Sequence, residues 1–269
     1  MNNPALEYKQ QIISWLQQQQ FRISGERSVK LTTTVITDHR WLLGIPLRDC
    51  PPAKLRQLLN HLQFPLSFAE PFLSHLADAS EIQIAIESLS EEEFSLRVYL
   101  EKWQYLQQQV ATGDLSPRTL NIGFKWQPGN PASERIDTYT CHPRLTCKDI
   151  VQRSDQFISK EGLPYLKPAL DELIINVAPD LDDQIIYLET LSDSTERCSI
   201  DLNLYPLKLR GRDLLHLSEA CARQFKTAEA NISKVLGRYA DCPLGHISFG
   251  LSDGAKPFFT AYFEQETLN

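Results

Sequence analysis

The sequence lacks the short motifs that mark several common ligand sites. It contains no GxGxxG, no P-loop and no DDxxD-type aspartate cluster, and none of its six cysteines forms a CxxC pair. The closest pair, Cys141 and Cys147, flanks His142 but has no second cluster to complete a zinc site. The cysteines are therefore expected to be reduced, structural thiols in a reducing compartment.

Long apolar runs and a basic charge balance are also missing. No stretch approaches the roughly 20 apolar residues of a membrane span, and Met1–Gln20 lacks the basic start and apolar core of a secretory signal. A net charge of −7 argues against a general nucleic-acid binder, although it is compatible with a small anion held by interior cations. We expect a cytoplasmic protein without nucleic-acid or membrane partners. No pattern indicates an oligomeric state.

Five pairs of segments show the period-two alternation of apolar and polar residues that is typical of half-buried strands. Polar turns separate the partners, so each pair is predicted to form an antiparallel hairpin. The predicted pairs are Ser28–Ile36 with Trp41–Arg48, Glu81–Leu89 with Phe94–Leu100, Thr119–Gln127 with Glu134–Cys141, Gln184–Leu191 with Cys198–Pro206, and His246–Leu251 with Pro257–Glu264.

Segments with helical periodicity lie before and between these hairpins. The predicted helices are Pro4–Gln20, Pro52–Leu62, Glu70–Ala77, Lys102–Ala111, Cys147–Ile158, Leu166–Val177 and Arg212–Leu236. The last of them is long and amphipathic. A hairpin followed by a helix thus recurs five times with no break in composition. We therefore expect one domain, residues 1–269, built of structural repeats.

The two faces of the predicted strands differ in composition. Along residues 95–100, for example, a face with Arg97 and Tyr99 alternates with a face carrying Leu96 and Val98. The amphipathic helices can cover the apolar faces. The polar faces hold tyrosines and small residues rather than mainly Lys and Glu, which suits a lumen better than an open surface. We expect an α+β fold, a ten-stranded antiparallel β-barrel surrounded by helices; the alternative is an open sheet with helices on one face.

Short motifs recur on the second strands of successive hairpins, namely Arg97-Val-Tyr99, Arg135-Ile-Asp-Thr-Tyr139, Asn203-Leu-Tyr205 and, on the final strand, Tyr262. With the five repeats, this order resembles the ABBA (PT-barrel) aromatic prenyltransferases from about residue 28 to the C-terminus. The short chain is nearer to bacterial members, including those that prenylate indole alkaloids of the hapalindole and ambiguine type, than to the longer fungal dimethylallyltryptophan synthases.

The resemblance implies an enzyme that moves a prenyl group from dimethylallyl or geranyl diphosphate to an aromatic acceptor, with indole as the expected ring. Such chemistry needs fixed positive charge for the leaving group and electron-rich faces for the carbocation. The expected diphosphate-binding residues are Arg97, Arg135, Lys125, Lys30, Lys256 and Asn203. The expected carbocation shield is Tyr99, Tyr139, Tyr205 and Tyr262. Structural ion pairs and ordinary barrel packing are the alternative roles of these arginines and tyrosines.

The remaining candidates concern the metal, the base and the acceptor. Asp137 stands where the family's element has a lysine, so it is either a Mg²⁺ ligand or the partner of Arg135; no organic cofactor is expected. The candidate catalytic carboxylates are Glu87, Glu189 and Glu172, each with a solvated or ion-paired side chain as its alternative. The candidate acceptor pocket is Trp103, Trp126 and Phe258, with rim packing as the alternative for the tryptophans. The rival function is a non-enzymatic barrel that binds a lipid or pigment.

Overall fold

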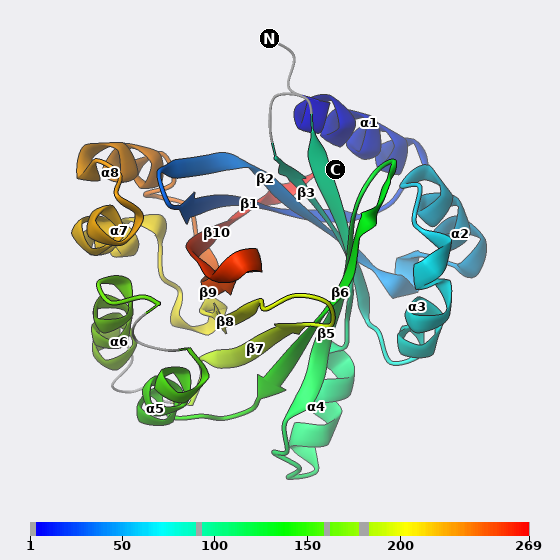
Figure 1. The fold of residues 1–269 in the computed structure, drawn as a ribbon. Coiled ribbons are helices and arrows are strands. Elements are labelled where there is room, and N and C mark those ends of the chain that lie inside the picture. The colour runs from blue at the N-terminus through cyan, green and yellow to red at the C-terminus, as the bar shows by residue number, and fades with distance from the viewer. Residues whose placement is uncertain (1–3, 90–92, 159–161, 178–182, 269) are drawn as a thin grey trace.

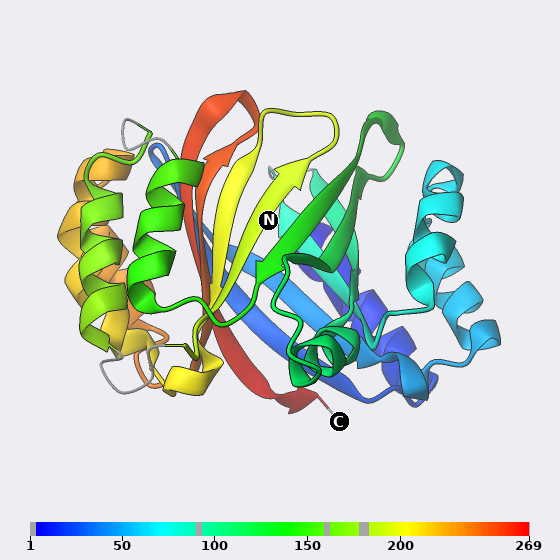
Figure 2. The same cartoon turned by 90° about the horizontal axis from the view of Figure 1, so that it is seen from below.

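A closed antiparallel β-barrel dominates the computed structural model, which describes residues 4–89, 93–158, 162–177 and 183–268. Its ten strands follow the order β1-β10-β9-β8-β7-β6-β5-β4-β3-β2, so every strand pairs with its neighbour in the chain and the last pairs with the first. Figure 1 looks down the barrel from the side of the hairpin turns, and Figure 2 shows those turns at one end and the C-terminus at the other. The predicted barrel is confirmed, and the open-sheet alternative is wrong.

The strands are β1 (Ile23–Thr32), β2 (Val35–Pro46), β3 (Glu81–Ser88), β4 (Phe94–Glu101), β5 (Arg118–Gln127), β6 (Asn130–His142), β7 (Ile186–Ser192), β8 (Cys198–Asn203), β9 (Leu244–Ser252) and β10 (Lys256–Leu268). The α-helices are α1 (Pro4–Gln18), α2 (Pro52–His61), α3 (Ala69–Leu76), α4 (Trp103–Ala111), α5 (Cys147–Phe157), α6 (Leu166–Val177), α7 (Ser218–Phe225) and α8 (Glu229–Gly237). Short 3₁₀ helices are η1 (Leu47–Asp49), η2 (Leu66–Phe68), η3 (Tyr205–Leu207), η4 (Gly211–Leu217) and η5 (Asp253–Ala255). Within the described residues, no helix is long and apolar enough to cross a membrane.

The hydrophobic core lies between the barrel and its helices rather than inside the barrel. The outward residues Ile82, Ile84 and Ile86 of β3 are fully buried under α1–α3. A second core lies between α5–α8 and the strands β1 and β8–β10. A smaller core packs α4 against β5–β7. Because side chains alternate across a strand, burial of the apolar faces outside leaves the polar faces to line the lumen.

The first hairpin differs from the prediction. Its turn lies at Thr33–Thr34 instead of residues 37–39, because Thr34 adopts a left-handed backbone (φ 66°) and its N–H donates to the Phe225 carbonyl oxygen at 2.8 Å. Strand β2 therefore begins at Val35 and places Arg40 opposite Ser28, next to a bulge in β2. The strand gains an inner-face cation that the predicted boundaries left outside both strands.

The predicted helix Arg212–Leu236 is also divided in the structure. It consists of η4, α7 and α8, because Lys226 takes a left-handed backbone (φ 53°) at the C-terminus of α7. The carbonyl oxygen of Phe225, left without a helical partner by this turn, accepts the N–H of Thr34. The break thus connects the helical layer to the first hairpin.

Aromatic packing between β5 and α2–α3 provides a test of the outer core. Phe124 is fully buried, and its ring centroid lies 5.4–5.7 Å from those of Phe64, Phe68 and Phe72. Phe124→Ala is expected to lower the free energy of unfolding by about 3–5 kcal/mol in urea denaturation, because it removes buried contacts and leaves a cavity. The control Leu66→Ala, at a side chain that is 91% exposed, is expected to change it by less than about 0.5 kcal/mol. Equal effects would contradict the packing described.

Candidate active site

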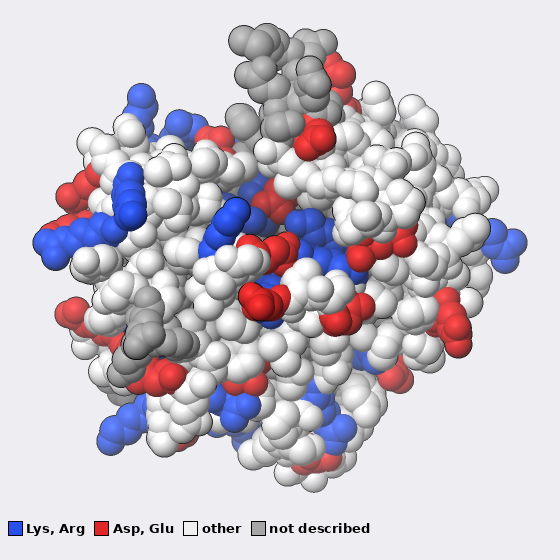
Figure 3. All heavy atoms as spheres, in the orientation of Figure 1, with Lys and Arg blue, Asp and Glu red and all other residues white. Residues whose placement is uncertain are grey.

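The barrel lumen contains two connected cavities. A central one of about 70 Å³ lies among the charged and tyrosine side chains, and one of about 320 Å³ lies toward the end opposite the hairpin turns. Residues such as Leu42, Gln83 and His246 line both, so the two belong to one lumen. Figure 3, viewed from the hairpin end, shows basic and acidic side chains gathered around a hollow at the centre of this face. We call the two parts the upper lumen, at the hairpin end, and the lower lumen.

Glu87 of β3 is the centre of one ion network in the upper lumen. Its carboxylate lies 2.8 Å from Lys30 Nζ, 3.2 Å from Arg40 Nε and 3.7 Å from Lys125 Nζ. Burial alone would raise the pKa of Glu87, but Arg40, Lys30 and Lys125 hold it well below its usual range. Glu87 is therefore a fixed anion, and it is poorly suited to accept a proton.

Asp137 of β6 is the centre of a second network and is fully buried. Its carboxylate pairs with Arg97 at 2.9 Å and with Arg197, and it lies 3.6 Å from Arg135 Nε. Burial opposes ionisation, but these guanidinium groups lower the pKa of Asp137 to about 2. Pairing with arginine, including Arg135, is thus the role that the structure shows.

A Mg²⁺ ligand role for Asp137 does not fit this arrangement. The guanidinium groups of Arg97 and Arg197 already contact its carboxylate, and a cation there would be repelled by both. Within the described ranges, no cluster of three or more His, Cys, Asp or Glu side chains has the geometry to hold a metal ion. The donor set around Asp137 is a cation cradle, which suits an anion instead.

Positive charge exceeds negative charge in the upper lumen. Its described cationic side chains are Lys30, Arg40, Arg97, Lys125, Arg135 and Arg197, whereas its carboxylates are Glu87 and Asp137, together with Asp201, which lines the cavity in an ion pair with His246. At the rim, Asp253 pairs with Arg135. The excess shows in Lys125: burial and the neighbouring cations, partly opposed by Glu87, lower its pKa to about 7. The upper lumen is thus arranged to receive a multiply charged anion.

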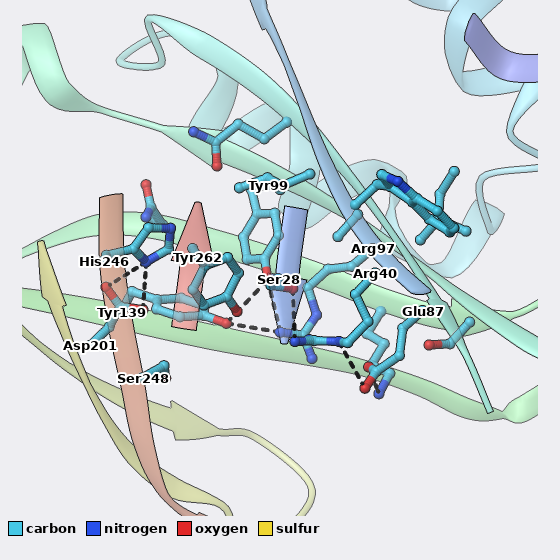
Figure 4. Close-up of a pocket in the computed structure, with 18 of the residues that line it drawn as sticks. Ser28, Arg40, Glu87, Arg97, Tyr99, Tyr139, Asp201, His246, Ser248 and Tyr262 are labelled. Atoms are coloured by element: carbon cyan, nitrogen blue, oxygen red, sulfur yellow. Dashed lines mark hydrogen bonds and ion pairs between the residues drawn. The ribbon is translucent and has the colours of Figure 1, made fainter. Parts of the chain in front are cut away.

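Three tyrosines border these cations (Figure 4). Arg97 Nη1 donates to the hydroxyl oxygens of Tyr99 at 3.0 Å and Tyr139 at 2.9 Å, and their rings meet edge to face with centroids 5.6 Å apart. Gly123 provides the space, because a Cβ atom there would lie 3.0 Å from the Tyr99 ring. Tyr262 lies across the cavity, with the Arg40 guanidinium 5.9 Å from its ring centroid. Cations and aromatic faces therefore alternate around one cavity.

His246 of β9 marks the boundary with the lower lumen. Its ring stacks on Tyr262 with centroids 3.9 Å apart, while Nδ1 lies 3.0 Å from Asp201 and Nε2 lies 3.0 Å from Glu26. Burial disfavours the charged ring, but the two carboxylates raise the pKa of His246 well above its usual value. The imidazolium is thus a fixed cation beneath Tyr262.

The structure brings together most of the residues predicted from the strand faces. Arg97, Lys125, Tyr99, Tyr139 and Tyr262 all line the central cavity. Other predicted residues lie at its margins. Lys30 approaches the ring of Phe258 at 5.8 Å, Arg135 reaches the rim, and Lys256 is exposed at the start of β10.

Three predicted residues lie in the lower lumen instead. Tyr205 is in η3, not in β8, and its hydroxyl group donates to Glu26. Asn203 accepts the backbone N–H of Tyr205, and Trp103 of α4 lines the same cavity. Tyr205 is therefore not part of the tyrosine group around the central cavity, and Asn203 lies apart from the cations.

Glu189, Glu172 and Trp126 lie outside the lumen, so their predicted catalytic or acceptor-pocket positions are wrong. Glu189 is on the outer face of β7, where His142 at 3.0 Å and Arg153 at 2.7 Å engage its carboxylate. Glu172 is exposed on α6. Trp126 packs in the outer core, with its ring centroid 5.5 Å from that of Phe64. In β7 the inner positions are Leu188 and Thr190, so Glu189 between them points outward.

The residues of the lumen that were missed from the sequence include Arg40, Arg197 and Glu26. Each lies two residues before the first inner-face residue of a predicted strand. Arg40 precedes Leu42, and Arg197 lies two residues before Ser199. Extending each predicted strand by one period of two would have found them. His246 was not among the predicted site residues, although its position opposite Asn203 places it inside the barrel.

No protein-family model and no curated protein matches the chain. Solved structures do match. The complex of PriB with product diphosphate has a TM-score of 0.58 at 14% identity and covers 91% of this chain and 80% of that one. The 5-dimethylallyltryptophan synthase from Streptomyces coelicolor has a TM-score of 0.58 at 12% identity, covering 90% and 81%. AnaPT from Neosartorya fischeri has a TM-score of 0.57 at 13% identity, covering 89% and 77%. The chain therefore has the ABBA (PT-barrel) fold of the aromatic prenyltransferases.

Proposed function

We propose that this protein is an aromatic prenyltransferase that joins an allylic diphosphate to an aromatic acceptor inside the barrel. The observation that carries the proposal is the excess of cations in the upper lumen directly beside the tyrosines of the central cavity. The solved structures of the same fold add support, because they include a complex with product diphosphate and one with L-tryptophan and dimethylallyl thiolodiphosphate. Indole as the acceptor ring and dimethylallyl or geranyl as the donor chain are the finer parts of the proposal.

In the proposed reaction, the diphosphate binds among the upper-lumen cations. Guanidinium groups suit this task because their planar donors match phosphate oxygens and retain their charge. Glu87 and Asp137 hold the cations in place but leave positive charge uncompensated. The bound diphosphate neutralises that excess, and it gains further negative charge as the carbon–oxygen bond breaks. The cationic cradle therefore stabilises the leaving group most strongly in the transition state.

The allylic carbocation then forms beside Tyr99, Tyr139 and Tyr262. Aromatic faces attract a cation by about 0.5–2 kcal/mol each without forming a bond to it. The barrel wall and its helices keep bulk water from the cation, which would otherwise become an alcohol. The acceptor ring attacks the cation, a ring carbon forms the new bond, and the proton on that carbon passes to the released diphosphate, which restores aromaticity. Glu87 is not suited to take that proton, because its cations stabilise the carboxylate.

The rival function, a carrier of a lipid or pigment, predicts a mainly apolar lumen. The lumen here contains two buried ion networks and a stacked imidazolium, which are costly to bury without a polar ligand. An apolar ligand would leave the excess cations without a partner. The charge distribution therefore favours the transferase.

Turnover provides the direct test of the proposed function. The full chain would be incubated with dimethylallyl or geranyl diphosphate and a panel of indoles and phenols, in Mg²⁺ and in EDTA. We expect pyrophosphate release and an acceptor mass increased by one prenyl unit. Activity should persist in EDTA, because protein cations supply the positive charge. Absence of pyrophosphate release with every acceptor, in both conditions, would overturn the proposal.

A substitution at Lys125 tests whether this residue contributes to diphosphate binding or to the stability of the fold. Its proton is lost near pH 7 in the folded protein but near pH 10 in an unfolded chain, so the charged lysine destabilises the fold fully below pH 7 and not above about pH 10. At pH 6.5, Lys125→Gln is expected to raise the free energy of unfolding in urea. The same variant is expected to weaken binding of dimethylallyl thiolodiphosphate by about tenfold, the loss of one charge-assisted contact.

The pH profile and a control complete this experiment. Wild-type affinity for the analogue should fall as pH rises from 7 to 9, because Lys125 loses its charge, and the variant should show a flatter profile. Lys234→Gln, at an exposed position on α8, should change neither quantity. A less stable Lys125→Gln protein that binds the analogue normally would show that Lys125 is a structural residue.

A further inference from the structure

The lower lumen is a cavity of about 320 Å³ that opens from the proposed reaction centre, and its charge is opposite to that of the upper lumen. No Lys or Arg lines it among the described residues, and His246 is its only cationic side chain. Its carboxylates are Glu26, Glu81, Glu101 and Asp201. Glu26 and Asp201 are both paired with His246. In the described part of the chain, no Lys or Arg side chain pairs with Glu81 or Glu101.

Glu81 and Glu101 face each other directly across β3 and β4. The amide of Gln83 donates to both, to Glu81 Oε1 at 3.0 Å and to Glu101 Oε2 at 2.8 Å. Burial and the charge of Glu81 raise the pKa of Glu101 to about 7. Like charges directly opposite each other destabilise a sheet. Such a pair gains stability from a ligand that brings positive charge.

The backbone leaves room for this pair. A Cβ atom on Gly44, the neighbour of Gln83 in β2, would lie 2.6 Å from Glu81 Oε1 and 2.5 Å from Ser24 Oγ. Any larger residue would force the Glu81 carboxylate out of its place. The pair therefore occupies space that the adjacent strand provides.

Several donors near the carboxylates are already engaged. The Gln83 amide donates hydrogen bonds to Glu81 and Glu101, and the Tyr205 hydroxyl group donates one to Glu26. Both ring nitrogens of His246 contact carboxylates. The Asn121 amide oxygen, on the inner face of β5 and lining both cavities, is fully buried without a hydrogen-bond partner. Amide and indole N–H groups of Asn121, Asn203 and Trp103 also line the cavity, but its charged groups are mostly carboxylates, so a ligand that brings positively charged N–H donors complements it.

We propose that the acceptor substrate carries a protonated nitrogen group beside its aromatic ring, and that Glu81 and Glu101 bind this group in the lower lumen. The inference rests on the proposed function and names the chemical class of its acceptor. The anionic donor lies among the upper-lumen cations, and the cationic end of the acceptor lies among the lower-lumen carboxylates. The aromatic ring lies between them, beside the tyrosines, where the Leu42 and Leu188 side chains also line the cavity.

The test compares acceptors that share a ring and differ in charge. Tryptamine, 3-methylindole and indole-3-propionate form one series, and tyramine, p-cresol and 3-(4-hydroxyphenyl)propionate form a second. With dimethylallyl diphosphate at pH 8, kcat/KM for the amine is expected to exceed that of the acid by tenfold or more in the series that reacts, about 1.4 kcal/mol or above. Calorimetric titration of each amine without donor measures binding independently of turnover.

Glu101→Gln is the diagnostic variant. It keeps the shape of the side chain and removes its charge, so it should reduce kcat/KM and affinity for the amine by about tenfold and change those of the neutral acceptor by less than twofold. Because the charged Glu101 destabilises the fold above its pKa, the variant should melt at or above the wild-type temperature at pH 8. Glu81→Gln should act in the same direction. Glu172→Gln, at an exposed position on α6, should change nothing.

Each outcome decides between the two proposals. Equal turnover of amine, neutral and acidic acceptors overturns the inference while the transferase stands. An equal loss of kcat/KM for the amine, neutral and acidic acceptors in Glu101→Gln also overturns the inference. That result would indicate that the carboxylates stabilise the carbocation instead. If no acceptor reacts, the transferase fails, and the titration decides the inference alone. Amine binding that is lost in Glu101→Gln supports a cation site, and absence of amine binding to the wild-type protein overturns it.

Discussion

Pairing of β1 with β10 is the constraint on which the rest of the structure depends. The ladder runs from Ile23 opposite Leu268 to Thr32 opposite Phe258, and it joins the two ends of the sheet into a barrel. Once the sheet is closed, each strand must present one face to the lumen, and the helices leave only the polar face for it. Ser28 and Lys30 of β1 meet Tyr262 and Thr260 of β10 across this seam. The proposed site is therefore a consequence of closure, since an open sheet would expose the same side chains to water.

Closure of the barrel removes charged side chains from water, and the two ion networks offset part of the free-energy cost. Charges removed from water are tolerated when partners satisfy them, and a buried carboxylate among several cations meets that condition. Glu87 and Asp137 each serve several cations, so a few anions hold a larger number of positive groups near one another. The remaining repulsion is visible in the lowered pKa of Lys125. A lumen arranged only for stability would balance its charges; imbalance of this kind is typical of a site that awaits a ligand.

Much of this arrangement could be predicted from the sequence, because strand alternation is a local property. Arg97 with Tyr99, and Arg135 with Tyr139, are two and four residues apart on strands whose limits the turns define well. The first hairpin was harder, because Thr34 turns through a contact with Phe225, nearly two hundred residues away, and no local pattern indicates it. Glu189 was misplaced for a related reason: its outward position depends on partners from α5 and β6. The chain's net charge also gave no sign of a cationic interior, since surface carboxylates outweigh it.

The cations and the tyrosines of the lumen are coupled to each other. The guanidinium carbons of Arg97 and Arg197 lie 5.5 Å and 5.9 Å from the ring centroids of Tyr99 and Tyr139, so these rings already interact with positive charge. A diphosphate that draws the same guanidinium groups toward its oxygens weakens their hold on the rings. In the proposed reaction, the electron-rich faces thus become available to a second cation when the leaving group is bound. His246 behaves differently, because Glu26 and Asp201 fix its ring against Tyr262 whether or not a diphosphate is present. In the proposed reaction, the faces of Tyr99 and Tyr139 therefore respond to the diphosphate, whereas the stacked pair of His246 and Tyr262 stays fixed at the boundary between the cationic and the acidic half of the lumen.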